Sequence, residues 1–181
     1  MEELYFIGII PETSIQAAVT TIKEDFKRYY HSSHALKSPP HITLIPPFKC
    51  TNTEIVRLSQ QTERLCQTIL PFNLLIQNFG AFPPHVIFLK LVDNIHLNAL
   101  QANLEQVLSV HFNFIKPCTR PFHPHMTIAF KDLSKIQFNA AWPIYAQRQF
   151  ETEFQVHELF LLHFKQKWQV VNSFWLGPKT T

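Results

Sequence analysis

Short apolar runs alternate along the chain with longer stretches in which apolar residues recur at helical spacing. The run Leu4–Ile10 predicts a buried strand, whereas Ile15, Val19, Ile22 and Phe26 follow the three- and four-residue spacing of a helix face. By this criterion we expect strands at Leu4–Ile10, His41–Ile45, Phe72–Phe82, His85–Val92, Phe112–Lys116, His125–Phe130, Phe154–Phe164 and Trp168–Leu176, and helices at Ser14–Tyr30, Thr53–Ile69 and Ile95–Val110. This irregular order of strands and helices indicates the α+β class.

Prolines and short polar residues set several of the expected boundaries. Pro46-Pro47 is expected to stop the strand that begins at His41, because proline has no amide hydrogen for a sheet. Thr13 or Ser14 is expected to cap the first helix. Residues 131–150 are predicted to be helical only in part, since Pro143 interrupts them.

One order of elements occurs twice. A strand, a helix, a loop and a strand that opens with Pro-His-x-Thr run from Phe6 to His41, a separation of 41 − 6 = 35, and from Phe88 to His125, where 125 − 88 = 37. Two similar units in one chain commonly pack about a pseudo-twofold axis, which brings equivalent strands together. We therefore expect one bilobal domain over residues 1–181, in which the two histidines meet.

The repeated strands read Pro40-His41-Ile42-Thr43-Leu44 and Pro124-His125-Met126-Thr127-Ile128. Residues i and i+2 of a strand share one face, so each histidine and its threonine project together while the apolar residues anchor the strand. One imidazole can accept a proton while the other donates one, and threonine hydroxyls can donate to phosphate oxygens. His41, Thr43, His125 and Thr127 are therefore the predicted catalytic residues.

Glycine and charge narrow the kind of substrate. The chain has only three glycines and no glycine-rich phosphate loop, so side chains must bind any phosphate. A net charge of +3 suits an anionic ligand but not a long duplex, which favours a small anion or a short RNA end. Three cations near the motif strands, Arg120, Lys49 and Lys131, are candidates for substrate binding, although such residues are more often solvated.

Loops 31–40 and 117–124 are expected to form the walls of the pocket. Aromatic side chains near the motifs could stack on a base, although core packing is the more common role; they are Tyr5, Phe6, Phe48, Phe122 and Phe130.

The three cysteines are odd in number and contain no CxxC pair, which argues against a disulfide framework or a zinc ribbon. Residues 1–11 lack the basic start of a signal peptide, and no apolar run reaches the ~18 residues of a membrane span. We therefore expect a cytoplasmic protein without a membrane partner, acting as a monomer.

PHITL at 40–44 and HPHMTI at 123–128 resemble the two signature motifs of the 2H phosphoesterase superfamily, in particular its bacterial branch of 2′-5′ RNA ligase-like (LigT-like) proteins. The similarity extends to YFIGIIP at 5–11, FLKL at 88–91 and the Arg120-Pro-Phe approach to the second motif. It implies a bilobal α+β fold in which two antiparallel sheets flank a central cleft, with helices outside.

The same resemblance implies an activity. It predicts cofactor-free and metal-free hydrolysis of 2′,3′-cyclic phosphates of RNA ends or small nucleotides to 2′-phosphates, with 2′-5′ RNA ligation as the reverse reaction. His125 would activate water as the base, and His41 would protonate the leaving ribose oxygen as the acid.

Three other interpretations stay open. The histidines could be structural, or the chain could be a catalytically idle binder of RNA ends or nucleotides that keeps the fold. The pair His123 and His125 could also bind zinc with His85 or His41 as a third ligand, but this would leave both threonines without a role. His157 and His163 are expected to be surface or satisfied histidines.

Overall fold

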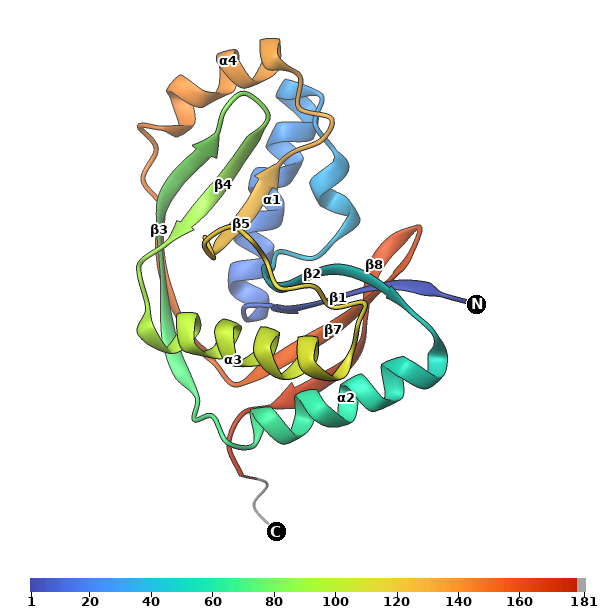
Figure 1. Cartoon of the computed structure of the whole chain (residues 1–181). Helices are drawn as coiled ribbons and strands as arrows, with labels where there is room; N and C mark the ends of the chain where they lie inside the picture. Colours follow the sequence, from blue (N-terminus) through green and yellow to red (C-terminus); the bar gives the residue numbers. More distant parts are fainter. Residues whose placement is uncertain (179–181) are drawn as a thin grey trace.

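A computed structural model describes residues 1–178 as an α+β fold built on one curled antiparallel sheet (Figure 1). Its strands are β1 Glu3–Ile9, β2 Ile42–Cys50, β3 Phe72–Phe82, β4 Val86–Leu91, β5 His125–Ala129, β6 Glu151–Val156, β7 Glu158–Lys165 and β8 Lys167–Trp175. Its helices are α1 Thr13–Tyr30, α2 Asn52–Cys66, α3 Ile95–His111 and α4 Lys135–Tyr145, with a 3-10 turn η1 at His34–Lys37. The predicted α+β class is confirmed.

The sheet consists of two halves of four strands. Its order is β6-β3-β4-β5-β2-β1-β7-β8, so the β5 half holds β6, β3, β4 and β5, and the β2 half holds β2, β1, β7 and β8. The halves join where Ile42 of β2 pairs with Met126 of β5. The two sheets expected from the sequence are thus joined edge to edge into one.

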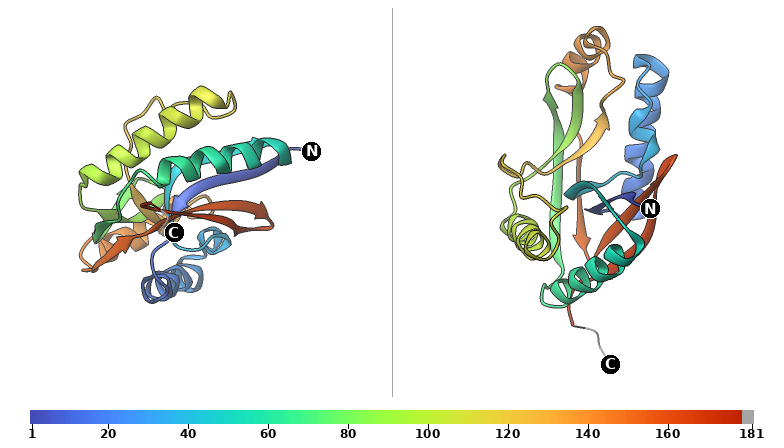
Figure 2. Two further views of the ribbon diagram at one scale, coloured as in Figure 1. Left: turned by 90° about the horizontal axis from the view of Figure 1, so that it is seen from below. Right: turned by 45° about the vertical axis from the view of Figure 1, so that its right-hand side comes forward.

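The repeated order of elements is visible in the topology. Strand β1 leads through α1 to its antiparallel neighbour β2, and β4 leads through α3 to its antiparallel neighbour β5. Helices α1 and α4 pack on the β5 half, while α2 contacts β8 and α3 contacts β2. The left view of Figure 2 shows α2 and α3 on one side of the strands and α1 on the other.

The predicted stop at Pro46-Pro47 is wrong, because β2 continues to Cys50. The pairing of β1 with β2 shifts register between Tyr5 and Ile7, which face Phe48 and Ile45, so the prolines lie at an irregularity in the ladder. Both prolines are exposed. A bulge needs no amide hydrogen from these positions, which is why proline is accepted there.

The predicted strand Phe154–Phe164 is also wrong, since His157 divides it into β6 and β7. Strand β6 pairs with β3 at one edge of the sheet, whereas β7 pairs with β1 in the other half. The run is continuously strand-like in sequence, so local pattern alone could not reveal that it crosses between halves.

Two local predictions also fail at chain turns. Residues Phe112–Lys116 form no strand, because the chain turns after α3 and the amide of Ile115 donates to the carbonyl of Phe112 at 2.9 Å. Neither predicted residue caps α1: the helix begins at Thr13, and the preceding Glu12 makes no side-chain capping bond. Residues 131–150 do contain a helix, α4, with Pro143 in its last turn.

No helix of the described residues is both long enough and apolar enough to cross a membrane.

Gly8 lies at a close approach between β1 and β2. A Cβ added there would lie 2.7 Å from the carbonyl oxygen of Ile42 and 3.2 Å from the Phe6 ring. Backbone cannot retreat as a flexible side chain can, so Gly8→Ala should lower the free energy of unfolding by about 1–3 kcal/mol. Urea unfolding followed by circular dichroism measures this.

The matched control is Gln169→Ala on the exposed edge strand β8, which should change the free energy of unfolding by less than about 0.5 kcal/mol. An unchanged midpoint in Gly8→Ala would show that β2 tolerates displacement next to its histidine.

Candidate active site

The two Pro-His-x-Thr segments lie next to each other where the halves of the sheet join. His41 immediately precedes β2, and His125 is the first residue of β5. The intervening residues Ile42 and Met126 are fully buried, whereas both histidines are only partly buried. Each strand therefore presents its polar pair on the face opposite to the core, as alternation predicts.

The register across the junction places each threonine beside the other segment's histidine. Ile42 pairs with Met126, so one step along the antiparallel ladder in either direction sets Thr43 opposite His125 and Thr127 opposite His41. Opposed residues of antiparallel strands project from the same face. The four side chains thus form one group to which each motif contributes a histidine and a threonine.

Both imidazoles are held by the same kind of hydrogen bond. Nδ1 of His41 lies 2.7 Å from the carbonyl oxygen of Pro39, and Nδ1 of His125 lies 2.7 Å from the carbonyl oxygen of His123. A carbonyl only accepts, so each Nδ1 carries the hydrogen and each Nε2 keeps its lone pair in the neutral ring. This tautomer leaves Nε2 of both rings for proton transfer.

A buried phenylalanine packs against each histidine. The ring centroids of Phe6 and His41 are 4.7 Å apart, and those of Phe88 and His125 are 4.9 Å apart. Phe6 lies on β1 and Phe88 on β4, the first strands of the two repeated units. The repeat therefore supplies a hydrophobic support for each imidazole as well as the imidazole itself.

Burial keeps both histidines neutral. It lowers the pKa of His41 to about 4, and the nearby positive charge of Lys23 and the charged form of His125 lower it further, against the Pro39 carbonyl. The pKa of His125 is lowered by burial and by the neighbouring His123. A phosphate anion between the rings would oppose these effects by favouring the protonated forms.

Lys23, whose charge lowers the pKa of His41, is a buried cation that the sequence did not lead us to predict. Its side chain is 2% exposed on α1, and Nζ donates to the carbonyls of Ala35 at 3.1 Å and Ser38 at 3.2 Å. Burial lowers its pKa to about 8. Lys23 lies four residues after Val19 and three before Phe26, on the apolar stripe of the helix, and that position was the available signal.

A hollow of about 310 Å³ opens beside Thr43 and His125. Arg120 and Phe122 of the loop before β5 line it, so the structure brings Arg120 to the predicted site. The amide of Cys118 donates to Glu105 of α3 at 2.9 Å, which ties this loop to the helix. The prediction that residues 117–124 form a wall agrees with this arrangement.

The structure does not bring Lys49 or Lys131 to the histidines. Lys49 lies six residues beyond Thr43 on the extended strand β2, roughly 20 Å away. The ammonium of Lys131 lies 5.4 Å from the centroid of the Phe130 ring, beyond the end of β5. Closeness in sequence to a motif strand is therefore a poor predictor of which cations lie near the histidines, because each further residue of an extended strand lies about 3.3 Å farther along it.

Other aromatic candidates have structural surroundings. Tyr5 donates to Glu3 and stacks on His163, Phe48 stacks on Phe114, and the ring of Phe130 contacts His34. His163 is buried and pairs with Glu3 at 3.3 Å, so it is a satisfied histidine, while His157 is exposed. In residues 1–178 no three histidine, cysteine, aspartate or glutamate side chains converge as a metal site, which gives the zinc interpretation no ligand set there.

Curated relatives match the chain over almost its full length. A Bacillus subtilis protein named RNA 2′,3′-cyclic phosphodiesterase is 28% identical over 185 aligned positions, covering 96% of each chain. A Geobacillus kaustophilus protein provisionally named a phosphoesterase is 29% identical and covers 98% of each.

Solved structures share the fold at low identity. Escherichia coli LigT in complex with 3′-AMP superposes with a TM-score of 0.71 at 17% identity, covering 97% of this chain and 99% of LigT. The Thermus thermophilus protein TT0787 superposes with a TM-score of 0.73 at 18% identity, covering 98% and 100%. The family profile described as the 2′-5′ RNA ligase superfamily matches residues 11–168. The resemblance found in the sequence is thereby confirmed, and the chain belongs to the 2′-5′ RNA ligase superfamily.

Proposed function

We propose that this protein is a metal-independent cyclic phosphodiesterase that opens 2′,3′-cyclic phosphates of RNA ends or small nucleotides to 2′-phosphates. The observation that carries the proposal is the Ile42–Met126 pair of the β2–β5 junction, which sets His125 opposite Thr43 and His41 opposite Thr127, with Nδ1 of each imidazole on a carbonyl and Nε2 available. The relative named RNA 2′,3′-cyclic phosphodiesterase supports the same reaction.

The reaction needs one proton accepted and one donated. Nε2 of one imidazole takes a proton from water as the water oxygen attacks phosphorus, and the bond from phosphorus to the ribose O3′ breaks. The protonated Nε2 of the other imidazole gives its proton to O3′, leaving a 2′-phosphate. The hydroxyls of Thr43 and Thr127 donate to the non-bridging oxygens, where charge develops in the transition state. When the 5′-hydroxyl of a second RNA attacks phosphorus in place of water, the same steps break the bond to O3′ and join the two RNA ends through a 2′-5′ bond, and the reverse reaction cleaves that bond.

Loss of either histidine should remove one of the two proton transfers. His41→Ala and His125→Ala should each lower kcat/KM for a nucleoside 2′,3′-cyclic phosphate by about a hundredfold or more, measured after dialysis against EDTA. His111→Ala, an exposed histidine at the end of α3, is the matched control and should retain full activity.

Full activity in either His41→Ala or His125→Ala would exclude the two-histidine mechanism. If wild type binds oligonucleotides as both variants do but turns over no cyclic phosphate, the chain is an idle binder. Activity that EDTA abolishes and zinc restores would instead support a metal hydrolase.

The resemblance assigns the base to His125 and the acid to His41, and we keep this assignment. When sulfur replaces O3′ in the cyclic phosphate, the leaving group is a thiolate, which needs no proton from a general acid. The fold-decrease in kcat/KM that His41→Ala causes should therefore be at least tenfold smaller with this substrate than with the oxygen substrate. The fold-decrease that His125→Ala causes should be the same with both substrates. The opposite pattern would exchange the two roles.

The lowered pKa values predict an acid-shifted pH profile. The plot of kcat/KM against pH reports the free protein, in which burial lowers the pKa of His41 to about 4 and lowers that of His125 from its ordinary value. One ring must be protonated and the other neutral, so kcat/KM should peak below pH 6.5 and fall as the pH rises towards 8. A constant kcat/KM from pH 7 to 9 would contradict the lowered pKa values of the two histidines.

A further inference from the structure

A second hollow, of about 480 Å³, shares Phe122 and His123 in its lining with the hollow that contains Arg120. We call it the Lys90 hollow. Its lining includes Gly80, Phe82, Phe88, Lys90 and His123. Asp93 also lines it, and its carboxylate accepts a hydrogen bond from the side-chain amide of Asn98 at 2.9 Å. Sequence reasoning predicted no role for Lys90 or Phe82.

Aromatic rings connect the Lys90 hollow to His125. The ring centroid of Phe82 lies 4.5 Å from that of Phe88, 5.3 Å from that of His125 and 5.3 Å from that of His123. Phe88 is buried, but Phe82 is 41% exposed. An exposed ring beside a catalytic group offers a planar surface on which a nucleobase can stack.

Lys90 stands directly across from His125. The two residues are partners in the β4–β5 ladder, so their Cα atoms are roughly 5 Å apart and their side chains share a face. A Cβ on Gly80 would lie 2.9 Å from Cγ of Lys90 and 2.5 Å from the ring of Phe88, so the absence of a side chain there makes room for both. Within residues 1–178 Lys90 forms no ion pair, which leaves its ammonium available for a ligand.

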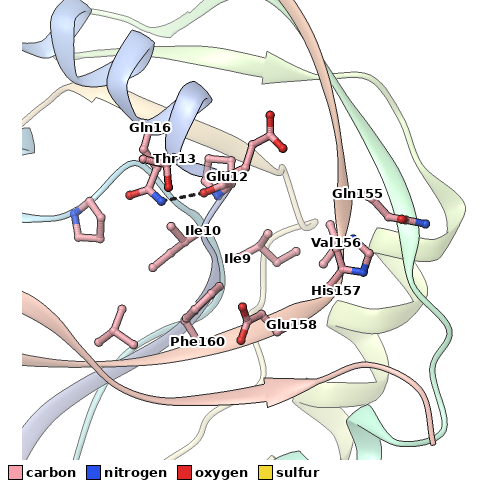
Figure 3. A pocket seen from close by; sticks show the side chains of 13 residues that line it. Ile9, Ile10, Glu12, Thr13, Gln16, Gln155, Val156, His157, Glu158 and Phe160 are labelled. Carbon is pink, nitrogen blue, oxygen red and sulfur yellow. Dashed lines mark hydrogen bonds between the residues drawn. The ribbon is translucent and has the colours of Figure 1, made fainter. Parts of the chain in front are cut away.

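A third hollow has a different charge. Its lining includes Pro39, whose carbonyl accepts the hydrogen bond of His41, and the carboxylates of Glu12 and Glu158. Figure 3 shows Glu12 at the start of α1 and Glu158 at the start of β7, with Ile9 between them and Phe160 next to Glu158. Two carboxylates without a lysine or arginine in the lining disfavour a phosphate there. The Lys90 hollow instead combines the carboxylate of Asp93 with Lys90, which forms no ion pair among residues 1–178.

We propose that the Lys90 hollow binds the nucleoside that bears the cyclic phosphate, with its base on Phe82 and its 5′-phosphate on Lys90. This assignment rests on the proposed cyclic phosphodiesterase function and adds a preference to it. A substrate whose terminal nucleoside carries a phosphate or phosphodiester at O5′, such as an RNA 3′ end, gains the contact with Lys90, and a free nucleoside 2′,3′-cyclic phosphate does not.

The test compares adenosine 2′,3′-cyclic phosphate with the same compound carrying a 5′-phosphate. Wild type should show a kcat/KM at least tenfold higher for the 5′-phosphorylated substrate, mainly through KM. Lys90→Gln should abolish this preference while changing kcat/KM for the unphosphorylated substrate less than threefold, and Lys90→Arg should keep most of it. Lys135→Gln, an exposed lysine at the start of α4, is the control and should leave both values unchanged.

A second variant tests the stacking surface. Phe82→Ala should raise KM for both substrates about equally, and Phe82→Trp should restore it. A 5′-phosphate preference that survives in Lys90→Gln, or its absence in active wild type, would overturn the assignment to the Lys90 hollow and leave the cyclic phosphodiesterase function standing. No turnover of either substrate by wild type would instead mean that the proposed function itself fails.

Discussion

Strands β2 and β5 meet through the antiparallel pair of Ile42 with Met126, and the arrangement of the candidate active site depends on this contact. Both side chains are fully buried. A slip of one residue in either strand would turn its histidine and threonine into the core, so burial of the apolar residues fixes the face on which the polar ones stand. The same pair brings the two halves of the sheet together, which is why fold and site are inseparable here.

The two halves are similar but not equivalent. Each supplies an imidazole whose Nδ1 donates to the carbonyl two residues earlier and whose ring rests on a buried phenylalanine. Their surroundings differ, because His41 lies near the buried ammonium of Lys23 whereas His125 lies near His123 and across from Lys90. The two halves thus provide two imidazoles that are held in the same way, and the departures from symmetry give each imidazole a different environment.

Much of this arrangement could be predicted from sequence, because it follows from alternation and repetition. The face shared by His41 and Thr43 needs only a two-residue period, and the meeting of the histidines follows from the repeated order of elements. Arg120 could be placed near the site because its loop leads directly into β5. These are local or repeated patterns, which can be recognised in one amino-acid sequence.

The remaining features depend on pairing between distant strands. Lys90 lies near the candidate site only because it pairs with His125 across β4 and β5. Pro46-Pro47 is accepted within β2 only because the pairing with β1 is irregular there. The crossing from β6 to β7 likewise leaves no local signal at His157. Lys23 is the instructive exception, since a lysine on the apolar stripe of α1 could have been recognised as buried from the helical spacing alone.

The central claim is that both imidazoles act on one phosphate through Nε2, and ¹⁵N NMR of the histidine rings tests it most directly. In the free protein His41 and His125 should both show the Nδ1–H tautomer and pKa values below 6.5. Saturation with a nucleoside 2′-phosphate should raise both pKa values and shift both Nε2 resonances. A response confined to one of the two rings would contradict the account.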